Sequence, residues 1–122
     1  MKRALVSMAA ALFFVVPGDV RADTNADIAE KMVRILERVA TVVEANRSDC
    51  NAMGDKLNAI IDENGAFIAD AKARSESMTA EERQQIQARF RARIQAATAK
   101  MVPGLRACGT NAKVTSAIQR VR

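Results

Sequence analysis

The chain lacks histidine, tryptophan and tyrosine, and its 122 residues include only two cysteines, two prolines and four phenylalanines. Without histidine it cannot form Ser-His or Cys-His nucleophile pairs, His-containing zinc sites or the Glu-x-x-His di-iron sites of helical bundles. A c-type haem is excluded too, because its attachment motif contains a histidine. We therefore expect no enzymatic activity, no cofactor and no metal site. The alternative that stays open is an enzyme that uses carboxylates or a metal.

Two pairs of adjacent carboxylates, Asp62-Glu63 and Glu81-Glu82, are the candidates for acid–base chemistry. Neighbouring side chains on a helix point about 100° apart, so adjacency alone does not direct both carboxylates at one substrate. The thioether sulfur of methionine is a ligand for the soft ion copper(I), and three methionines of the expected helices are therefore considered as copper ligands. Each of them falls on the apolar face of an expected helix, which favours packing in the core. These methionines are Met32, Met53 and Met101.

Residues 1–22 are typical of an export signal that is cleaved from the mature protein. Two basic residues precede a mostly apolar run over residues 4–16, and a Val-Arg-Ala sequence follows at the cleavage positions. The run is shorter than the roughly 20 residues that a membrane-spanning helix needs. We expect cleavage near Ala22, which leaves residues 23–122 as a single domain.

The mature chain offers no candidate for a transmembrane segment, because its longest apolar run, residues 39–43, is interrupted by Thr41. No cysteine follows directly after the cleavage site, so a lipid anchor is not indicated. We therefore expect the protein in the periplasm or the extracellular space. Nucleic acid is not an expected partner there, and aromatic rings that stack on single strands are nearly absent.

Apolar residues recur three and four positions apart along the mature chain, which is the period of an amphipathic α-helix. This pattern predicts an all-α fold with helices over about 26–46, 50–74, 80–107 and 111–120. A turn of about four residues joins the second and third helices, which predicts an antiparallel hairpin. The first helix packs on this hairpin, and the short last helix closes one end.

Local sequence signals predict where the helices begin and end. Thr24 or Asn25 can cap the first helix. The Ser-Glu-Ser segment over residues 75–77 predicts a turn before the third helix. At the start of that helix, Thr79 and Glu82 form a capping box, in which each side chain accepts from the other's backbone N–H.

Two glycine positions disturb the helical pattern. Gly65 falls on the apolar seam of the second helix, where an interior glycine costs about 1 kcal/mol relative to alanine. A kink, or close packing against a neighbouring helix, is one interpretation, and a break into two shorter helices is the other. The pair Pro103-Gly104 predicts a kink or an interruption of the third helix.

The two cysteines provide a test of this layout. Cys50 begins the second helix and Cys108 lies near the end of the third, so an antiparallel hairpin brings both to the same end. Cysteines in an exported protein commonly form disulfides. We therefore predict a disulfide between Cys50 and Cys108 that is structural, since nothing resembles a C-x-x-C redox motif.

Charge is unevenly distributed along the mature chain. Residues 23–82 hold 13 acids and seven bases, whereas residues 83–122 hold nine bases and no acid. In one interpretation, the third helix packs between the acidic first and second helices, and its arginines pair with their carboxylates. In the other, its arginines contact an anionic envelope surface such as phospholipid or lipopolysaccharide, or an acidic protein partner.

The residues that would make such a contact lie together in the third helix. If Phe90 points inward, Arg89 and Arg93 flank one side of the apolar stripe and Arg91 flanks the other. The candidate contact residues for a client or an anionic surface are Arg89, Phe90, Arg91 and Arg93.

The segment over residues 78–85, Met-Thr-Ala-Glu-Glu-Arg-Gln-Gln, resembles the LTxxQ motif of the periplasmic helical chaperones of the Spy and CpxP type. Met78 and Glu82 stand where the motif has Leu and Gln. The resemblance implies ATP-independent holding of unfolded client proteins. The overall layout also resembles small exported helical proteins with two cysteines.

These observations predict a non-catalytic binding or structural role in the cell envelope, with a periplasmic holdase as the specific alternative. A holdase would present Ile86, Phe90 and Ile94 on an accessible face, because unfolded clients expose apolar side chains. In a purely structural module the same three residues would form core.

Overall fold

A computed structural model describes residues 24–122. The expected export signal and its cleavage site lie outside these residues. Within them the chain forms four helices and no strand, which confirms the all-α prediction. The helices are α2 (Asn25–Ala45), α3 (Cys50–Ser77), α4 (Ala80–Cys108) and α5 (Ala112–Arg120).

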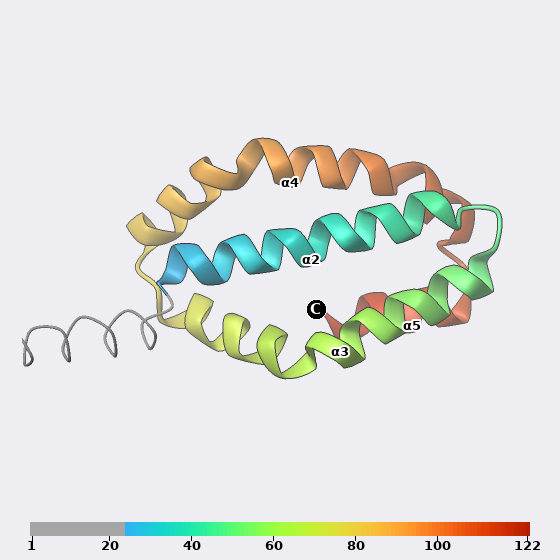
Figure 1. Ribbon diagram of the computed structural model, residues 1–122, viewed down its shortest axis with the longest axis horizontal. Helices are drawn as coiled ribbons and strands as arrows, with labels where there is room; N and C mark the ends of the chain where they lie inside the picture. The colour runs from blue at the N-terminus through green and yellow to red at the C-terminus, as the bar shows by residue number, and fades with distance from the viewer. Residues whose placement is uncertain (1–23) are drawn as a thin grey trace, which may run out of the picture.

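The two longest helices, α3 and α4, run antiparallel and are joined by the short turn at Met78 and Thr79 (Figure 1). The first helix, α2, lies between them, and α3 and α4 make little direct contact with each other. The last helix, α5, packs against the N-terminal half of α3. The expected arrangement, a hairpin carrying the first helix and closed by a short last helix, is therefore confirmed.

The central position of α2 corrects the interpretation in which α4 lies between the other two long helices. The physical reason is that α2 is apolar on two sides. Buried Val33 and Ala40 lie toward α4, while Leu36 and Val39 lie toward α3 and α5. A helix with two apolar sides buries both only when it lies between two neighbours.

Helix α3 is longer than expected, because residues 75–77 continue the helix and do not form a turn. Arg74 in its last turn interacts favourably with the helix dipole and pairs with Asp70 one turn earlier. The Ser77 hydroxyl donates to the Arg74 carbonyl at 2.9 Å. These interactions stabilise a last turn that serine propensity alone does not favour.

The predicted caps form, with one change of partner. Thr24 and Asp27 make the capping box of α2. At α4, the Thr79 hydroxyl accepts from the Glu82 backbone N–H at 3.1 Å, as expected. The Glu82 carboxylate, however, accepts from the Asn25 side-chain amide at 3.0 Å. The second half of this expected capping box is thus replaced by a contact between the starts of α2 and α4.

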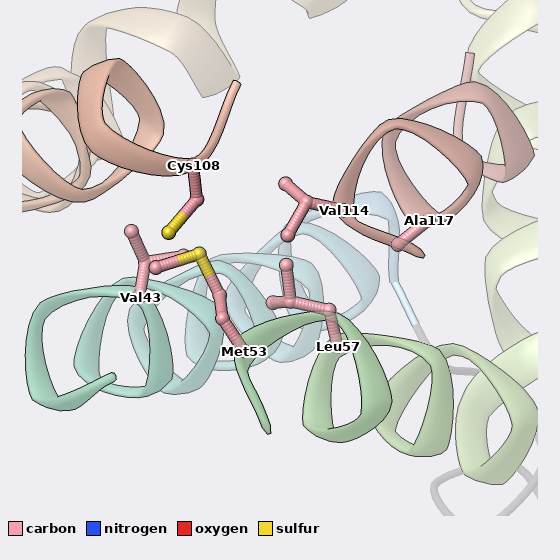
Figure 2. Close-up of a cluster of buried hydrophobic side chains, with 6 residues drawn as sticks. All are labelled: Val43, Met53, Leu57, Cys108, Val114 and Ala117. Carbon is pink, nitrogen blue, oxygen red and sulfur yellow. The ribbon is translucent and has the colours of Figure 1, made fainter. Parts of the chain in front are cut away.

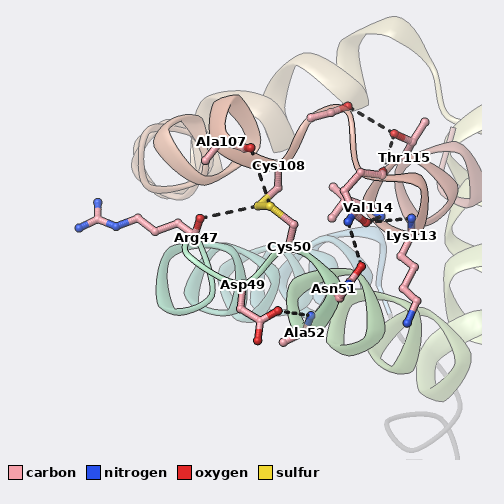
Figure 3. Close-up of a disulfide and its surroundings, with 12 residues drawn as sticks. Arg47, Asp49, Cys50, Asn51, Ala52, Ala107, Cys108, Lys113, Val114 and Thr115 are labelled. Carbon is pink, nitrogen blue, oxygen red and sulfur yellow. Dashed lines mark hydrogen bonds between the residues drawn. A yellow bond between two sulfur atoms is a disulfide. The ribbon is translucent and has the colours of Figure 1, made fainter.

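The disulfide between Cys50 and Cys108 is present, with the two Cα atoms 5.2 Å apart (Figure 3). It joins the start of α3 to the end of α4, at the opposite end of these helices from the Met78 turn. Its sequence separation is 58 residues, and closing a loop of that length stabilises the folded state by about 4 kcal/mol in the chain-entropy model.

The buried core lies against this disulfide, where all four helices meet (Figure 2). Met53, Val43 and Val114 are fully buried there, and Cys108 is 1% exposed. The rest of the cluster comprises Leu57 and Ala117. Of the three methionines considered for copper, Met53 is therefore a core residue, and Met101 packs against the same cluster.

Two glycines allow the helices to approach closely at this end. A Cβ atom on Gly104 of α4 would lie 2.5 Å from Val43 Cγ1 and 2.8 Å from the Val43 carbonyl oxygen of α2. A Cβ atom on Gly54 of α3 would lie 2.4 Å from Lys113 Cβ of α5. Helix α4 continues through Pro103 and Gly104 without interruption. These glycines are therefore required by packing, because a larger residue would push the helices apart.

Gly65 is different from both. Helix α3 continues through it, so the interpretation of a break into two shorter helices is wrong. The helix instead changes direction in its middle part (Figure 1). A Cβ atom at Gly65 would have no neighbour within 4 Å, which also excludes close packing there. The neighbouring Asn64 amide donates to the Ile60 carbonyl one turn earlier, at 2.8 Å.

We predict opposite effects of alanine at two of these glycines. Gly104→Ala should lower the free energy of unfolding by about 1–3 kcal/mol, because its Cβ meets backbone atoms that cannot move aside. Gly65→Ala should raise it by up to about 1 kcal/mol, because an interior helical glycine is replaced where space is open. Urea denaturation of the oxidised protein measures both. Equal effects of the two substitutions would contradict the close approach of α2 and α4.

Candidate functional site

The helices diverge away from the disulfide and leave two adjoining clefts. The α5 cleft lies between α2, α3 and α5 and has a volume of about 240 Å³. Every residue that lines it is apolar, and seven of them are leucine or isoleucine. These seven are Ile35, Leu36, Leu57, Ile60, Ile61, Ile68 and Ile118.

The second cleft, here the α4 cleft, lies between the first half of α2, the second half of α3 and the first half of α4. Its volume is about 410 Å³. Met32, Ile68 and Val121 line both clefts, so the two spaces adjoin. Small-molecule sites have volumes of about 300–1,000 Å³ and mostly apolar walls, and the α4 cleft falls within this range. The α4 wall of this cleft is formed by Ile86, Phe90 and Ile94.

The clefts exist because α5 is too short to cover α3. It spans nine residues against the 28 of α3, so the apolar side chains of the second half of α3 lack a covering helix. Val121 lies directly after α5, at the junction of the clefts, and is 49% exposed. Met32, Ile35 and Ile68 are likewise only half-buried. This surface is apolar and open to solvent, in contrast to the closed core at the disulfide.

Two cations line the α4 cleft. The Lys72 ammonium donates to a main-chain oxygen of Arg122, the last residue of the sequence, at 3.1 Å. The Arg83 guanidinium donates to the Met78 carbonyl at 3.2 Å. Both side chains are exposed, and no carboxylate is among the described residues that line this cleft. The cleft therefore combines apolar walls with two cationic side chains, each of which already has one main-chain oxygen as a partner.

The four predicted contact residues separate into three groups. Phe90 is buried, at 4% exposure, and belongs to the wall of the α4 cleft. Arg93 is half-buried and pairs with Glu30 and Glu37 of α2. Arg89 and Arg91 are exposed. The structure thus brings Phe90 and Arg93 into contact with α2 or the cleft, and leaves Arg89 and Arg91 on the solvent side of α4.

The Arg93 guanidinium makes a two-pronged contact with one carboxylate. Its Nη2 donates to Glu37 Oε1 at 2.6 Å, and its Nε donates to Glu37 Oε2 at 3.3 Å. A further hydrogen bond goes to Glu30. The hydrogen bond from Arg93 holds the pKa of Glu37 below its ordinary value of 4.5, and the two carboxylates raise the pKa of Arg93. This contact fixes α4 on α2 at mid-length.

Further ion pairs join the basic C-terminal part to the acidic first part. Lys113 pairs with Asp55 at 2.9 Å, and Arg120 pairs with Asp62. Both pairs join α5 to α3. Arg93, Lys113 and Arg120 thus pair with carboxylates of the acidic part, but only Arg93 belongs to α4. The interpretation in which the arginines of the third helix pair internally therefore holds for Arg93, and exposed pairs of this kind stabilise a fold only weakly.

The carboxylates considered for acid–base chemistry do not converge. Asp62 pairs with Arg120 of α5, whereas its neighbour Glu63 pairs with Arg38 of α2 at 2.8 Å. Glu82 binds Asn25. In the described part of the chain, no group of three or more cysteine, aspartate or glutamate side chains could hold a metal ion. No helix in residues 24–122 is both long and apolar enough to cross a membrane.

Comparison of the chain with protein-family models, curated proteins and solved structures finds no match. The site must therefore be interpreted from its own geometry.

Sequence reasoning missed the clefts, because it assigned the apolar stripes of the helices, including Met32, to the core. One signal was available. The expected last helix is less than half as long as the second, so the last apolar positions of the second helix have no covering partner in sequence. Recognising this requires knowledge of which helix α5 packs against.

The Arg93 contact predicts a pH dependence of stability. Because the folded-state pKa of Glu37 is lowered, the contact stabilises the fold fully above pH 4.5 and is lost as the pH falls further through the folded-state pKa. Glu37→Gln should lower the melting temperature at about pH 7, and the difference from the wild type should be smaller at about pH 3. Glu44→Gln, which removes an exposed carboxylate of the same helix, should change it little at either pH. An equal loss for Glu37→Gln at both values would contradict the assignment.

Proposed function

We propose that the protein is an exported, non-catalytic binding protein of the cell envelope, whose adjoining clefts bind an apolar group. The observation that carries this proposal is the apolar, half-exposed surface around Met32, Ile68 and Val121. Soluble proteins rarely expose a contiguous apolar surface without using it for binding.

Its location in the periplasm or the extracellular space is part of the proposal. It rests on the export-signal pattern over residues 1–22 and on the disulfide, which is typical of an oxidising compartment. A non-catalytic role is supported by the separate partners of Asp62 and Glu63, which direct the two carboxylates to different helices.

A neutral fluorescent probe tests the proposal. N-phenyl-1-naphthylamine, which brightens in apolar surroundings, should bind the oxidised protein saturably. Ile68→Gln places a polar amide at the junction of the clefts and should weaken this binding about tenfold, a loss that corresponds to about 1.4 kcal/mol. Ile68 is half-buried, so the variant should remain folded, which circular dichroism would check.

The matched control is Val102→Gln. Val102 is an apolar residue of α4 that is 37% exposed and does not line either cleft. This variant should bind the probe as the wild type does. If the wild type fails to bind the probe, or if both variants weaken it equally, the proposed function is wrong.

A holdase is the second candidate. It is favoured by one observation: half-buried Ile86 and Ile94 lie in the helix turns next to the exposed Arg89 and Arg91, so apolar and cationic groups occur together on α4. The resemblance of residues 78–85 to the LTxxQ motif lies at the start of the same helix.

For this candidate, equimolar protein should suppress the aggregation of a chemically denatured client. Ile86→Ser should weaken the suppression while the protein stays folded. Phe90→Ala is the less informative variant, because Phe90 is buried and its truncation should cost about 3–5 kcal/mol of stability. Absence of suppression at several-fold molar excess would remove the holdase and leave the apolar-ligand proposal intact.

A further inference from the structure

We infer that the occupant of the clefts is a free long-chain carboxylate, with its acyl chain between the helices and its head group beside Lys72 and Arg83. This inference rests on the proposed function, because it names the ligand of the same clefts. Three observations carry it: the apolar lining of the clefts, the way in which the two clefts adjoin, and the position of two cationic side chains at the α4 cleft.

The walls favour a ligand without polar groups along its length. Every residue that lines the α5 cleft is apolar, and those of α2 and α3 lie on continuous helices whose backbone groups bond within the helix. An extended peptide placed there would lose hydrogen bonds to water and gain none from the walls. An acyl chain has no such groups to satisfy.

The shape favours a linear ligand. The α5 and α4 clefts adjoin at Met32, Ile68 and Val121, so a single flexible chain can occupy both in sequence. The α5 cleft lies nearer to the closed core and has only apolar lining residues. The α4 cleft is larger and includes polar side chains. A ligand that is apolar along its chain and polar at one end matches this order.

The charges at the α4 cleft favour an anionic head group. Lys72 and Arg83 are the charged residues that line it. Glu82 binds Asn25 and Asp27 binds the Thr24 backbone, so these two carboxylates are occupied elsewhere. Exposed Glu76, one turn after Lys72 in α3, does not line the cleft. Lys72 and Arg83 each use one hydrogen bond, to main-chain oxygens of Arg122 and Met78. An ammonium carries three N–H donors and a guanidinium five, so both keep donors that a carboxylate can accept.

Displacement of the neutral probe by ligands of graded length and charge tests the inference. Decanoate, dodecanoate and tetradecanoate, used below micelle-forming concentrations, should displace it with an affinity that rises up to about fourfold per methylene group. Dodecanoate should bind about three- to tenfold more tightly than dodecanol, the range expected for two exposed charge contacts.

The charge assignment has a matched pair of variants. Lys72→Gln/Arg83→Gln should reduce dodecanoate affinity to that of dodecanol and leave dodecanol binding unchanged. Arg89→Gln/Arg91→Gln removes the same number of charges from exposed positions that do not line the clefts, and should change neither ligand. All four side chains are exposed, so both double variants should remain folded.

Each of the other outcomes would contradict a specific part of the inference. If dodecanoate and dodecanol bind equally, or the two double variants have the same effect, the anionic head group is wrong, while the apolar cleft stands. If fatty carboxylates fail but an amphipathic helical peptide displaces the probe, the occupant is a protein segment. If the neutral probe itself does not bind, the proposed function fails together with this inference.

Discussion

The bond between Cys50 and Cys108 is the constraint on which the rest of the structure depends. It joins the start of α3 to the end of α4, and the chain itself joins these helices again at Met78 and Thr79. The two long helices therefore form a closed covalent ring with α2 lying between them (Figure 1). Since the ring is closed at both ends, neither long helix can separate from α2 without also displacing the other.

The two ends of this ring are built differently. At the disulfide end, Gly54 and Gly104 remove the side chains that would hold helices apart, and Met53 and Val43 fill the space between them. At the other end, the helices meet through polar contacts such as that between Asn25 and Glu82. Core packing thus closes one end, whereas hydrogen bonds and a short turn close the other. The clefts lie between these two closures.

Periodicity in the sequence predicted the helices, because it depends on local spacing. The same spacing placed Phe90 on the apolar stripe of the third helix, and Phe90 is buried in the structure. The disulfide followed from the similar lengths of the second and third helices and the short turn between them. The order of the helices across the bundle was not predictable, because an apolar stripe shows that a helix has a partner and not which one. The role of Ile68 shows this limit. Its stripe position predicts burial, and only the shortness of α5 in its actual position leaves it half-exposed.

The clefts remain open because α2 and α4 are fixed at a set distance by a polar contact. Arg93 binds Glu37 through two hydrogen bonds and also binds Glu30, so α4 cannot slide along α2 to cover the apolar residues around Ile68. On the other side of α2, Arg38 forms an exposed pair with Glu63 of α3, which adds a weak stabilisation to this arrangement. Closing the clefts would break these contacts or strain the covalent ring. The apolar ligand that we propose would therefore enter a space that the fold already maintains, and its binding would require little rearrangement of the helices.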